Sequence, residues 1–405
     1  MDSRKVSSLS ILSDASGASS CASPRPSNLL VEDVGLLPVP DPGPAPWRRL
    51  AAAGSFVCAL AGEQRVLVTE LRLRADTECV VARSAVLELP GARAEERRYL
   101  DCGLVVVQAE VRLLLLGERR NKERFCSVVE VLTSGQARLQ LGRELAVYDK
   151  ASMLGKQLTH LATSSNQGAE CEVFTCGNLI RYYIIIPIIL LLLLSYYIIC
   201  RKLRTERAGA EVKLAPTTAR VQVPPECVDG TLSLCVASHP TKSSFTIVAS
   251  FKTKSAGKNK YQICWFQGRG DEISAPGGKS AVKLGEDQEP SVVLADPRDP
   301  RAVFVLCNNS QDSTAGLHKL VRGRKLEEAI ATFPFPVTEA ALVLGADKSL
   351  FLLALDPSND GGGLRVYQVV RTQGYRGQQA AWARCPQLAQ AMGPAMHAVS
   401  CSQQR

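Results

Sequence analysis

The sequence predicts a mainly β protein, with strand-rich, propeller-like domains and one transmembrane helix. Short apolar runs separated by charged or glycine-containing turns recur along most of the 405 residues, which is typical of β-strands. One run of 19 residues carries no charge, which is typical of a membrane span. A composition of 46% hydrophobic and 21% charged residues excludes a wholly disordered chain, a collagen-like chain and a multi-span membrane protein.

The uncharged run from Tyr182 to Cys200 predicts a transmembrane helix over residues 182–200. At 1.5 Å per residue it would be about 28 Å long, close to the ~30 Å hydrocarbon thickness of a bilayer. Tyrosine pairs stand near both ends, where aromatic rings favour the headgroup level. A buried strand or core helix is the alternative, but core strands usually have about 4–8 residues and core helices are seldom apolar on every face.

Basic residues follow this run: Arg201, Lys202, Arg204 and Arg207. Before it, only Arg181 is basic back to Lys156, so the positive-inside rule places the C-terminal side in the cytoplasm. The four basic residues are candidates for lipid-headgroup contact, although a plain topology signal explains them equally well. Cys200, beside them, is a palmitoylation candidate, and chance placement explains it equally well.

The composition changes along the chain and predicts six segments. They are a disordered Ser/Pro-rich tail (1–47), a strand-rich domain (48–170), the helix (182–200), a basic linker (201–220), a propeller-like β domain (221–390) and a second tail (391–405). A single crossing would place the two β domains in different compartments. If both halves instead formed one propeller, the apolar run would have to dip into the membrane and return, or be buried.

Three stretches near the C-terminus, Pro336–Leu344, Ala346–Ala354 and Leu364–Tyr367, alternate apolar strands with an Asp turn and a glycine turn. Together they resemble a degenerate WD40-type propeller blade that lacks the Gly-His and Trp-Asp dipeptides. With one span, the chain is weakly similar to the membrane-tethered guanine-nucleotide exchange factors of the endoplasmic reticulum, which load a coat-forming GTPase. Those proteins place the span after the propeller, whereas here it interrupts the strand-rich region. The resemblance implies a small GTPase as the protein partner.

The residues that carry enzymatic chemistry are sparse. The chain has four histidines, and we find no Ser/His/Asp order, no paired carboxylates and no metal-ligand spacing, so we expect no enzyme, no catalytic residue, no cofactor and no metal. Cys171 and Cys176 precede the apolar run and are disulfide candidates if that side is oxidising, with two unpaired thiols as an even alternative.

These observations favour a membrane-anchored, propeller-like protein-interaction scaffold at the endoplasmic reticulum or another endomembrane, with vesicle transport as its setting. Its expected partners are the lipid bilayer and a protein, not nucleic acid or a small-molecule substrate. One alternative is a cell-surface receptor or adhesion protein with an extracellular N-terminal domain, and another is an exchange factor for a small coat-forming GTPase. Trp265, Phe266 and Tyr367 are candidates for a protein contact, with core packing the stronger expectation for each.

Overall fold

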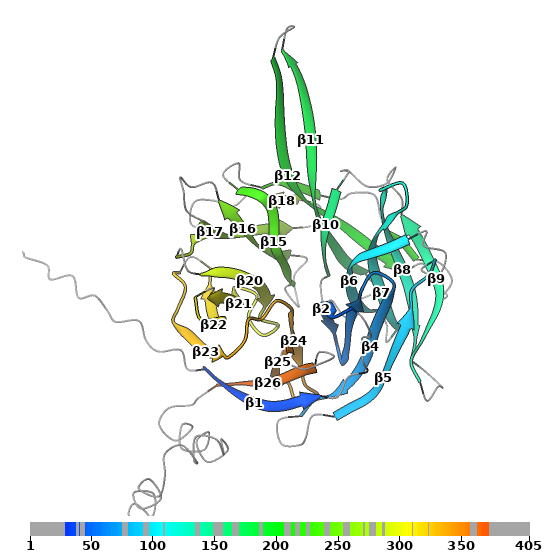
Figure 1. Cartoon of the computed structure of the whole chain (residues 1–405), viewed down its shortest axis with the longest axis vertical. Coiled ribbons are helices and arrows are strands. Elements are labelled where there is room, and N and C mark those ends of the chain that lie inside the picture. The colour runs from blue at the N-terminus through cyan, green and yellow to red at the C-terminus, as the bar shows by residue number, and fades with distance from the viewer. Residues whose placement is uncertain are drawn as a thin grey trace, which may run out of the picture.

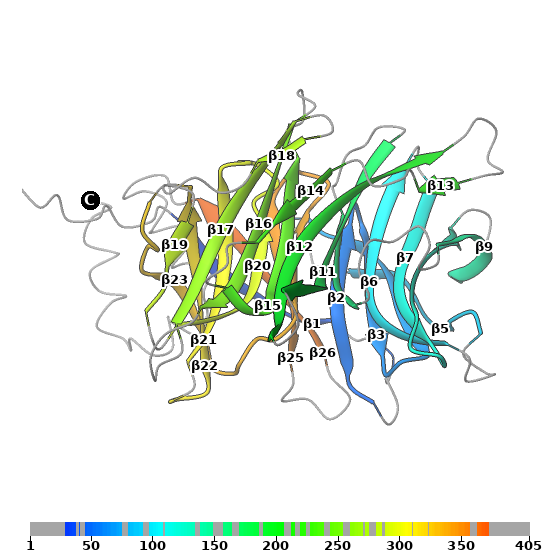
Figure 2. The same cartoon turned by 90° about the horizontal axis from the view of Figure 1, so that it is seen from above.

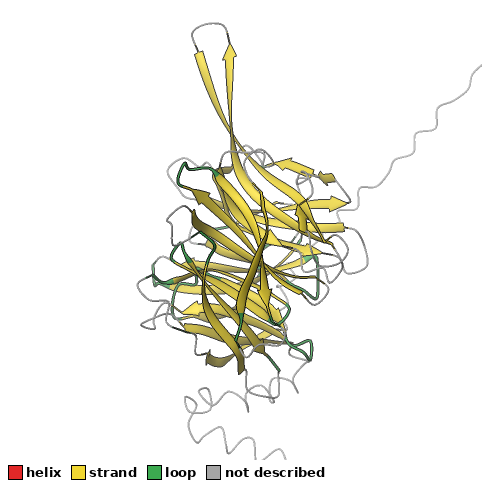
Figure 3. Cartoon of the chain, turned by 90° about the vertical axis from the view of Figure 1, so that its right-hand side faces the viewer, coloured by secondary structure: helices red, strands yellow, loops and turns green. Residues whose placement is uncertain are grey.

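In a computed structural model, the described residues form β-strands and turns, and none of them is helical (Figure 3). The structure describes residues 29–37, 40, 45–74, 80–91, 97–107, 110–133, 138–148, 157–163, 170–185, 189–205, 212–214, 219–223, 227–238, 244–253, 260–269, 272–274, 281–285, 288–309, 311–322, 324–356 and 363–371.

The strands of the described chain fall into six antiparallel sheets. The first three sheets contain β2 (Trp47–Ala53), β3 (Phe56–Ala61), β4 (Arg65–Arg72) and β5 (Val80–Glu88); β6 (Arg97–Val107), β7 (Glu110–Arg119), β8 (Arg124–Leu132) and β9 (Gln140–Tyr148); and β10 (Gln157–Thr163), β11 (Glu170–Ile185), β12 (Ile189–Thr205), β13 (Val212–Leu214) and β14 (Ala219–Gln222).

The other three sheets complete the set. They contain β15 (Cys227–Ser238), β16 (Ser244–Thr253), β17 (Lys260–Arg269), β18 (Glu272–Ser274) and β19 (Ala281–Lys283); β20 (Glu289–Ala295), β21 (Ala302–Asn309), β22 (Thr314–Val321) and β23 (Ala329–Phe333); and β24 (Ala340–Leu344), β25 (Leu350–Asp356), β26 (Gly363–Arg371) and β1 (Leu29–Leu37).

The sheets are arranged as the blades of one closed β-propeller (Figures 1 and 2). The first strands of successive sheets contact one another in the order β2, β6, β10, β15, β20 and β24, and β24 contacts β2 again. Strands from before and after residues 182–200 therefore lie in the same ring. A propeller fold is confirmed, but the sequence analysis confined it to residues 221–390 beside a separate β domain, whereas the ring includes both halves of the chain.

An N-terminal strand closes the ring. β1 pairs antiparallel with β26 and becomes the outer strand of the sheet that also holds β24 and β25. Residues 29–37, which the sequence assigned to a disordered tail, form this strand because they pair with β26, where Leu30 and Val31 stand opposite Val370 and Val369. β24, β25 and β26 match the three strands that the sequence predicted for a blade near the C-terminus.

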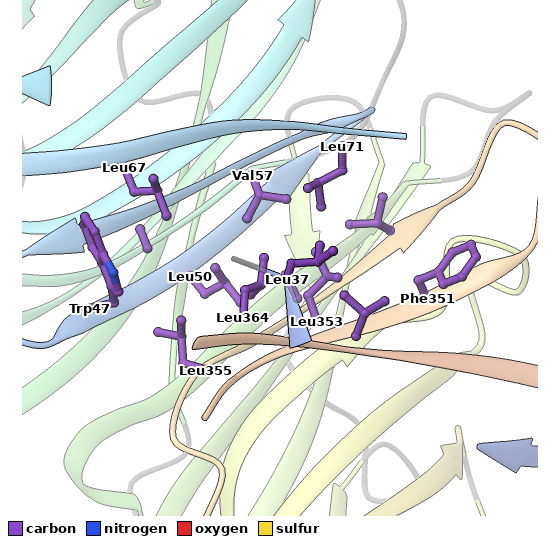
Figure 4. Close-up of a cluster of buried hydrophobic side chains, with 14 of the residues drawn as sticks. Leu37, Trp47, Leu50, Val57, Leu67, Leu71, Phe351, Leu353, Leu355 and Leu364 are labelled. Atoms are coloured by element: carbon purple, nitrogen blue, oxygen red, sulfur yellow. The ribbon is translucent and has the colours of Figure 1, made fainter. Parts of the chain in front are cut away.

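The hydrophobic core lies between neighbouring sheets. Figure 4 shows one such layer, in which Leu37, Trp47 and Leu67 pack with Phe351 and Leu353, joining the first sheet to the last. Similar clusters of described residues fill four further interfaces between blades. Trp265, Phe266 and Tyr367 are buried in these layers, so they serve packing, as the stronger of the two expectations held.

The prediction of a transmembrane helix is wrong for the described residues. Residues 182–185 end β11 and residues 189–200 belong to β12, and the two strands form a long hairpin that projects from the ring (Figure 1). Tyr182 pairs with Leu192, so the apolar run doubles back on itself within its own length, whereas a helical span would run in one direction across about 30 Å. No helix long and apolar enough to cross a membrane occurs in the described part of the chain.

Candidate functional site

The starts of the innermost strands gather on one face of the propeller. A four-stranded meander reverses direction three times, so its last strand ends on the face where its first strand began. The next inner strand therefore starts there too, and the turn between the second and third strands of each blade lies on this same face. Arg48, Arg97 and Glu339 all come from or just before such strand starts, on β2, β6 and β24 respectively.

A cavity of about 430 Å³ opens on this face in the second blade. Its lining residues are Arg97 at the start of β6 and Arg119, Arg120 and Asn121 at the turn between β7 and β8, a set that we call the arginine cavity. Its volume lies within the ~300–1,000 Å³ of small-ligand pockets. Three guanidinium groups and one amide present hydrogen-bond donors, and among the described residues no carboxylate lines the cavity.

Phe125, at the start of β8, contacts two of these guanidinium groups with its aromatic ring. The Cζ atoms of Arg97 and Arg119 lie 5.2 and 5.8 Å from the centroid of its buried ring. Tyr99 packs edge-on against the same ring and donates a hydrogen bond to the Pro90 carbonyl oxygen at 2.7 Å. Contact with an aromatic face restrains an arginine, so less conformational freedom is lost when a ligand binds.

Carboxylates around the cavity hold the neighbouring cations in place. Glu144 accepts a hydrogen bond from Arg97 at 2.7 Å. Glu118, almost buried, pairs with Arg98 at 2.5 Å and with Arg124 at 3.0 Å. These pairs fix the walls of the cavity, while Arg120 stays exposed at the tip of the turn.

A second polar cluster ties three inner strands together near the ring's axis. The backbone N–H groups of Arg49 and Leu50 on β2 donate to the carboxylate of Glu339, with Leu50 at 3.2 Å from Oε2. Arg49 has φ of 58°, and two successive N–H groups in such a turn form a concavity that accepts an anion. Burial raises the pKa of Glu339, and the nearby Arg48 and Arg49 oppose that rise.

Two buried cysteines, Cys58 and Cys102, lie in the core next to this cluster. The Cys102 thiol donates to the Arg49 carbonyl oxygen at 3.0 Å and lies 3.6 Å from the sulfur of Cys58. The hydrogen bond to Cys58 and burial raise the pKa of the Cys102 thiol well above its usual value. Asp101, also buried, accepts a hydrogen bond from the Cys102 backbone N–H at 2.9 Å. A thiol held protonated in this way connects strands and is a poor nucleophile.

The site residues predicted from the sequence lie elsewhere, on the projecting hairpin. Cys171 and Cys176 stand five residues apart on β11, so their Cα atoms are about 16 Å apart, and a disulfide joins Cα atoms about 4.4–6.8 Å apart. The predicted disulfide does not fit this strand. Cys200, Arg201, Lys202 and Arg204 belong to β12, and Arg207 lies outside the described residues. Palmitoylation and lipid contact stay predictions.

The arginine cavity was missed because its members are separate in sequence and ordinary in type. Arg119, Arg120 and Asn121 form a turn that reads as a solvated charge run, and Arg97 precedes it by more than twenty residues. Only the pairing of β6 with β7, which sets Arg97 opposite Arg119, brings them together. Two arginine-containing segments, a strand start and the turn of the hairpin that follows it, are the sequence signal that could have predicted the arginine cavity.

Comparison with known proteins supports the fold. No protein-family profile matches the chain, and no curated protein does. Among solved structures, an α-L-arabinanase of Penicillium chrysogenum complexed with arabinobiose aligns at a TM-score of 0.52 and 9% identity, over 84% of this chain and 98% of that one. A sialidase of Trypanosoma rangeli complexed with the inhibitor DANA aligns at 0.44 and 10% identity, over 84% of this chain, which spans 57% of the sialidase.

This comparison corrects two expectations. The apolar run and the WD40-type resemblance suggested a membrane-anchored interaction scaffold at an endomembrane, with a receptor or an exchange factor as alternatives. The lack of a catalytic constellation suggested no enzymatic activity. The solved structures reported above are instead enzymes, named sialidase and arabinanase, and at 9–10% identity the likeness shows the propeller fold alone. The error arose because the strand pattern of one blade is shared by propellers of unrelated functions.

Proposed function

We propose that this propeller binds an acidic small molecule, carrying a carboxylate, phosphate or sulfate group, in the arginine cavity. The observation that carries the proposal is the lining of that cavity by Arg97, Arg119, Arg120 and Asn121. Guanidinium groups are planar forks of donors that match the oxygens of carboxylates and phosphates two at a time. The volume of about 430 Å³ suits a ligand of monosaccharide size better than a macromolecule.

The electrostatic setting favours the same class of ligand. The net charge of the chain is +9, and the exposed Lys122 in the same turn adds a cation beside the lining arginines. Restraint of Arg97 and Arg119 by Phe125 lowers the entropic cost of closing on an anion. We therefore expect affinity to fall as salt rises, because the cavity is open to solvent and its field is screened.

The direct test is calorimetric titration of the full chain with four probes: inorganic phosphate, sulfate, sialic acid as an acidic sugar, and arabinobiose as a neutral sugar. Arg120→Gln removes one charged donor, and a hydrogen bond to a charged group is worth about 1.5–3 kcal/mol, so affinity should fall roughly tenfold or more. Arg301→Gln is the matched control, because Arg301 is an exposed arginine of another blade, with its side chain 81% accessible.

Two results would count against the proposal. Equal binding of acidic and neutral probes would show that charge does not select the ligand, and unchanged affinity in Arg120→Gln would remove this cavity from the binding site. The same samples should be incubated with chromogenic glycosides of sialic acid and arabinose. Turnover that Arg120→Gln reduces and Arg301→Gln does not would place a sugar-cleaving reaction at the same face.

A further inference from the structure

The hairpin of β11 and β12 extends beyond the strands that flank it. β10 pairs with β11 only as far as Asn178, and β14 pairs with β12 from Tyr197 onward. Between these points, residues 179–185 and 189–196 pair with each other, and no other described strand contacts their outer edges. We call these two segments the ribbon, and it is the part that projects from the ring in Figures 1 and 3.

The ribbon is apolar along almost its whole length. Its β12 part contains Ile189, five consecutive leucines, Ser195 and Tyr196 and has no charge, while its β11 part has one charged residue, Arg181. Because successive strand residues belong to opposite faces, consecutive leucines place apolar residues on both faces. An isolated two-stranded hairpin is marginally stable in water, so the ribbon requires a partner.

Lipid is a poor partner for this ribbon. In the hydrocarbon region each unpaired backbone N–H or C=O costs several kcal/mol, so open sheet edges do not occur there. Within the described part of the chain, the ribbon leaves two edges of seven and eight residues unpaired. A strand from another chain satisfies such an edge directly, and a four-stranded sheet exceeds the three strands that independent stability requires.

We propose that two copies of this chain associate through the ribbon, with β12 of one copy pairing antiparallel with β12 of the other. The β12 edge is preferred because pairing through β11 would bring two Arg181 residues together. Antiparallel pairing across residues 189–196 spans about 27 Å and directs the two propellers to opposite ends of the shared sheet, so they do not collide. The contact is isologous, as in most symmetric dimers.

The oligomeric state of the full chain tests this proposal. We expect light scattering to give at least twice the 43.7 kDa of one chain. Replacing residues 179–195 by Asn-Gly, which suits a two-residue hairpin turn, keeps the Asn178–Tyr196 pair and should give a monomer with an unchanged β spectrum. Leu192→Lys places a charge in the edge and should weaken association at least tenfold, whereas Leu192→Met should not.

Flotation with vesicles of phosphatidylcholine and phosphatidylserine tests whether the ribbon binds lipid instead of a second copy of the chain. Association lost in the Asn-Gly variant, without flotation of the wild type, is the result expected. A monomeric wild type, a variant that associates as strongly as the wild type, or a wild type that floats with vesicles through the ribbon and does not self-associate would each overturn the proposal. None of these outcomes bears on the arginine cavity.

Discussion

The Arg365 guanidinium on β26 contacts the Asp33 carboxylate on β1 at 3.1 Å and so joins two positions 332 residues apart in the chain. The same guanidinium lies 3.2 Å from the carboxylate of Asp356, whose side chain is 1% exposed, whereas that of Asp33 is 39% exposed. One arginine therefore serves both the closing strand and a buried acid in the neighbouring strand.

Replacing these partners should have unequal costs. Arg365→Gln takes a cation from the buried Asp356 and should lower the free energy of unfolding by roughly 3 kcal/mol, because removing one partner of a buried pair is expensive. Asp33→Asn removes a half-exposed partner and should cost under about 1 kcal/mol. Urea unfolding of both variants and of the double variant checks this, and equal losses in the two single variants would contradict the assignment.

Gly117→Ala should disturb the arginine cavity without touching its lining. A Cβ at position 117 would lie 2.7 Å from Cε1 of Phe125, so the ring that supports Arg97 and Arg119 must move. We expect a loss of roughly 1–3 kcal/mol in unfolding free energy, together with weaker binding of acidic probes. Gly285→Ala is the control, since its nearest neighbour is the mobile end of Gln288 at 3.4 Å. Unchanged binding in Gly117→Ala would show that Phe125 does not order the site.

The free energy of unfolding should fall as pH rises, because the carboxyl of Glu339 is buried. Burial raises the pKa of its carboxyl above the value of 4.5 in an exposed chain, so the folded state holds the proton more tightly than the unfolded state. Stability should therefore fall as pH rises from about 4.5 through the folded pKa, and Glu339→Gln should flatten this part of the profile. Urea midpoints between about pH 4 and about pH 8 measure it.

Asp312 provides a control of opposite sign. Its exposed carboxylate accepts a hydrogen bond from the Thr314 hydroxyl, which lowers the pKa of Asp312, so any stabilisation is present at neutral pH and is lost as pH falls. Asp312→Asn should alter only the acidic end of the profile. A pH profile that stays the same in Glu339→Gln would mean that its carboxyl is as solvated in the folded protein as in the unfolded chain.

The buried thiols should resist alkylation until the protein unfolds. The hydrogen bond to Cys58 and burial raise the pKa of Cys102 well above its usual value, and burial raises that of Cys307 to about 12. At about pH 8 few of these groups are thiolates, which is the form that reacts. Differential alkylation read by mass spectrometry should label both cysteines only in denaturant. Rapid labelling of Cys102 in the native protein would show a thiol exposed and acidic enough to act in chemistry.

The strand pattern was predictable because local sequence determines it. The apolar run from Leu350 to Leu355 lies between two turn-forming segments, as a blade strand does. The strands β24, β25 and β26 appear where this pattern predicted them. The role of β1 was not predictable, because Leu29, Leu30 and Val31 stand in a Ser/Pro-rich region and become a strand only by pairing with β26. Tertiary contact overrides local composition there.

The apolar run shows the same limit more sharply. Its length and lack of charge suit a membrane helix, and composition alone does not distinguish that helix from an extended hairpin with apolar residues on both faces. Pro187 stands near the point where β11 gives way to β12. The hairpin pairs the second half of the run, Leu193 to Cys200, with residues Phe174 to Arg181, which precede the run, so the apolar run alone does not contain its own pairing partners.

The pairing of β1 with β26 also constrains how the protein is made. The ribosome synthesises residues 29–37 long before residues 363–371. During the synthesis of the residues between them, β1 therefore cannot form its hydrogen bonds with β26. The ring therefore cannot close until translation has passed position 371. A circular permutant that began at β2 and carried β1 after β26 would remove that wait and make the closing sheet a local meander.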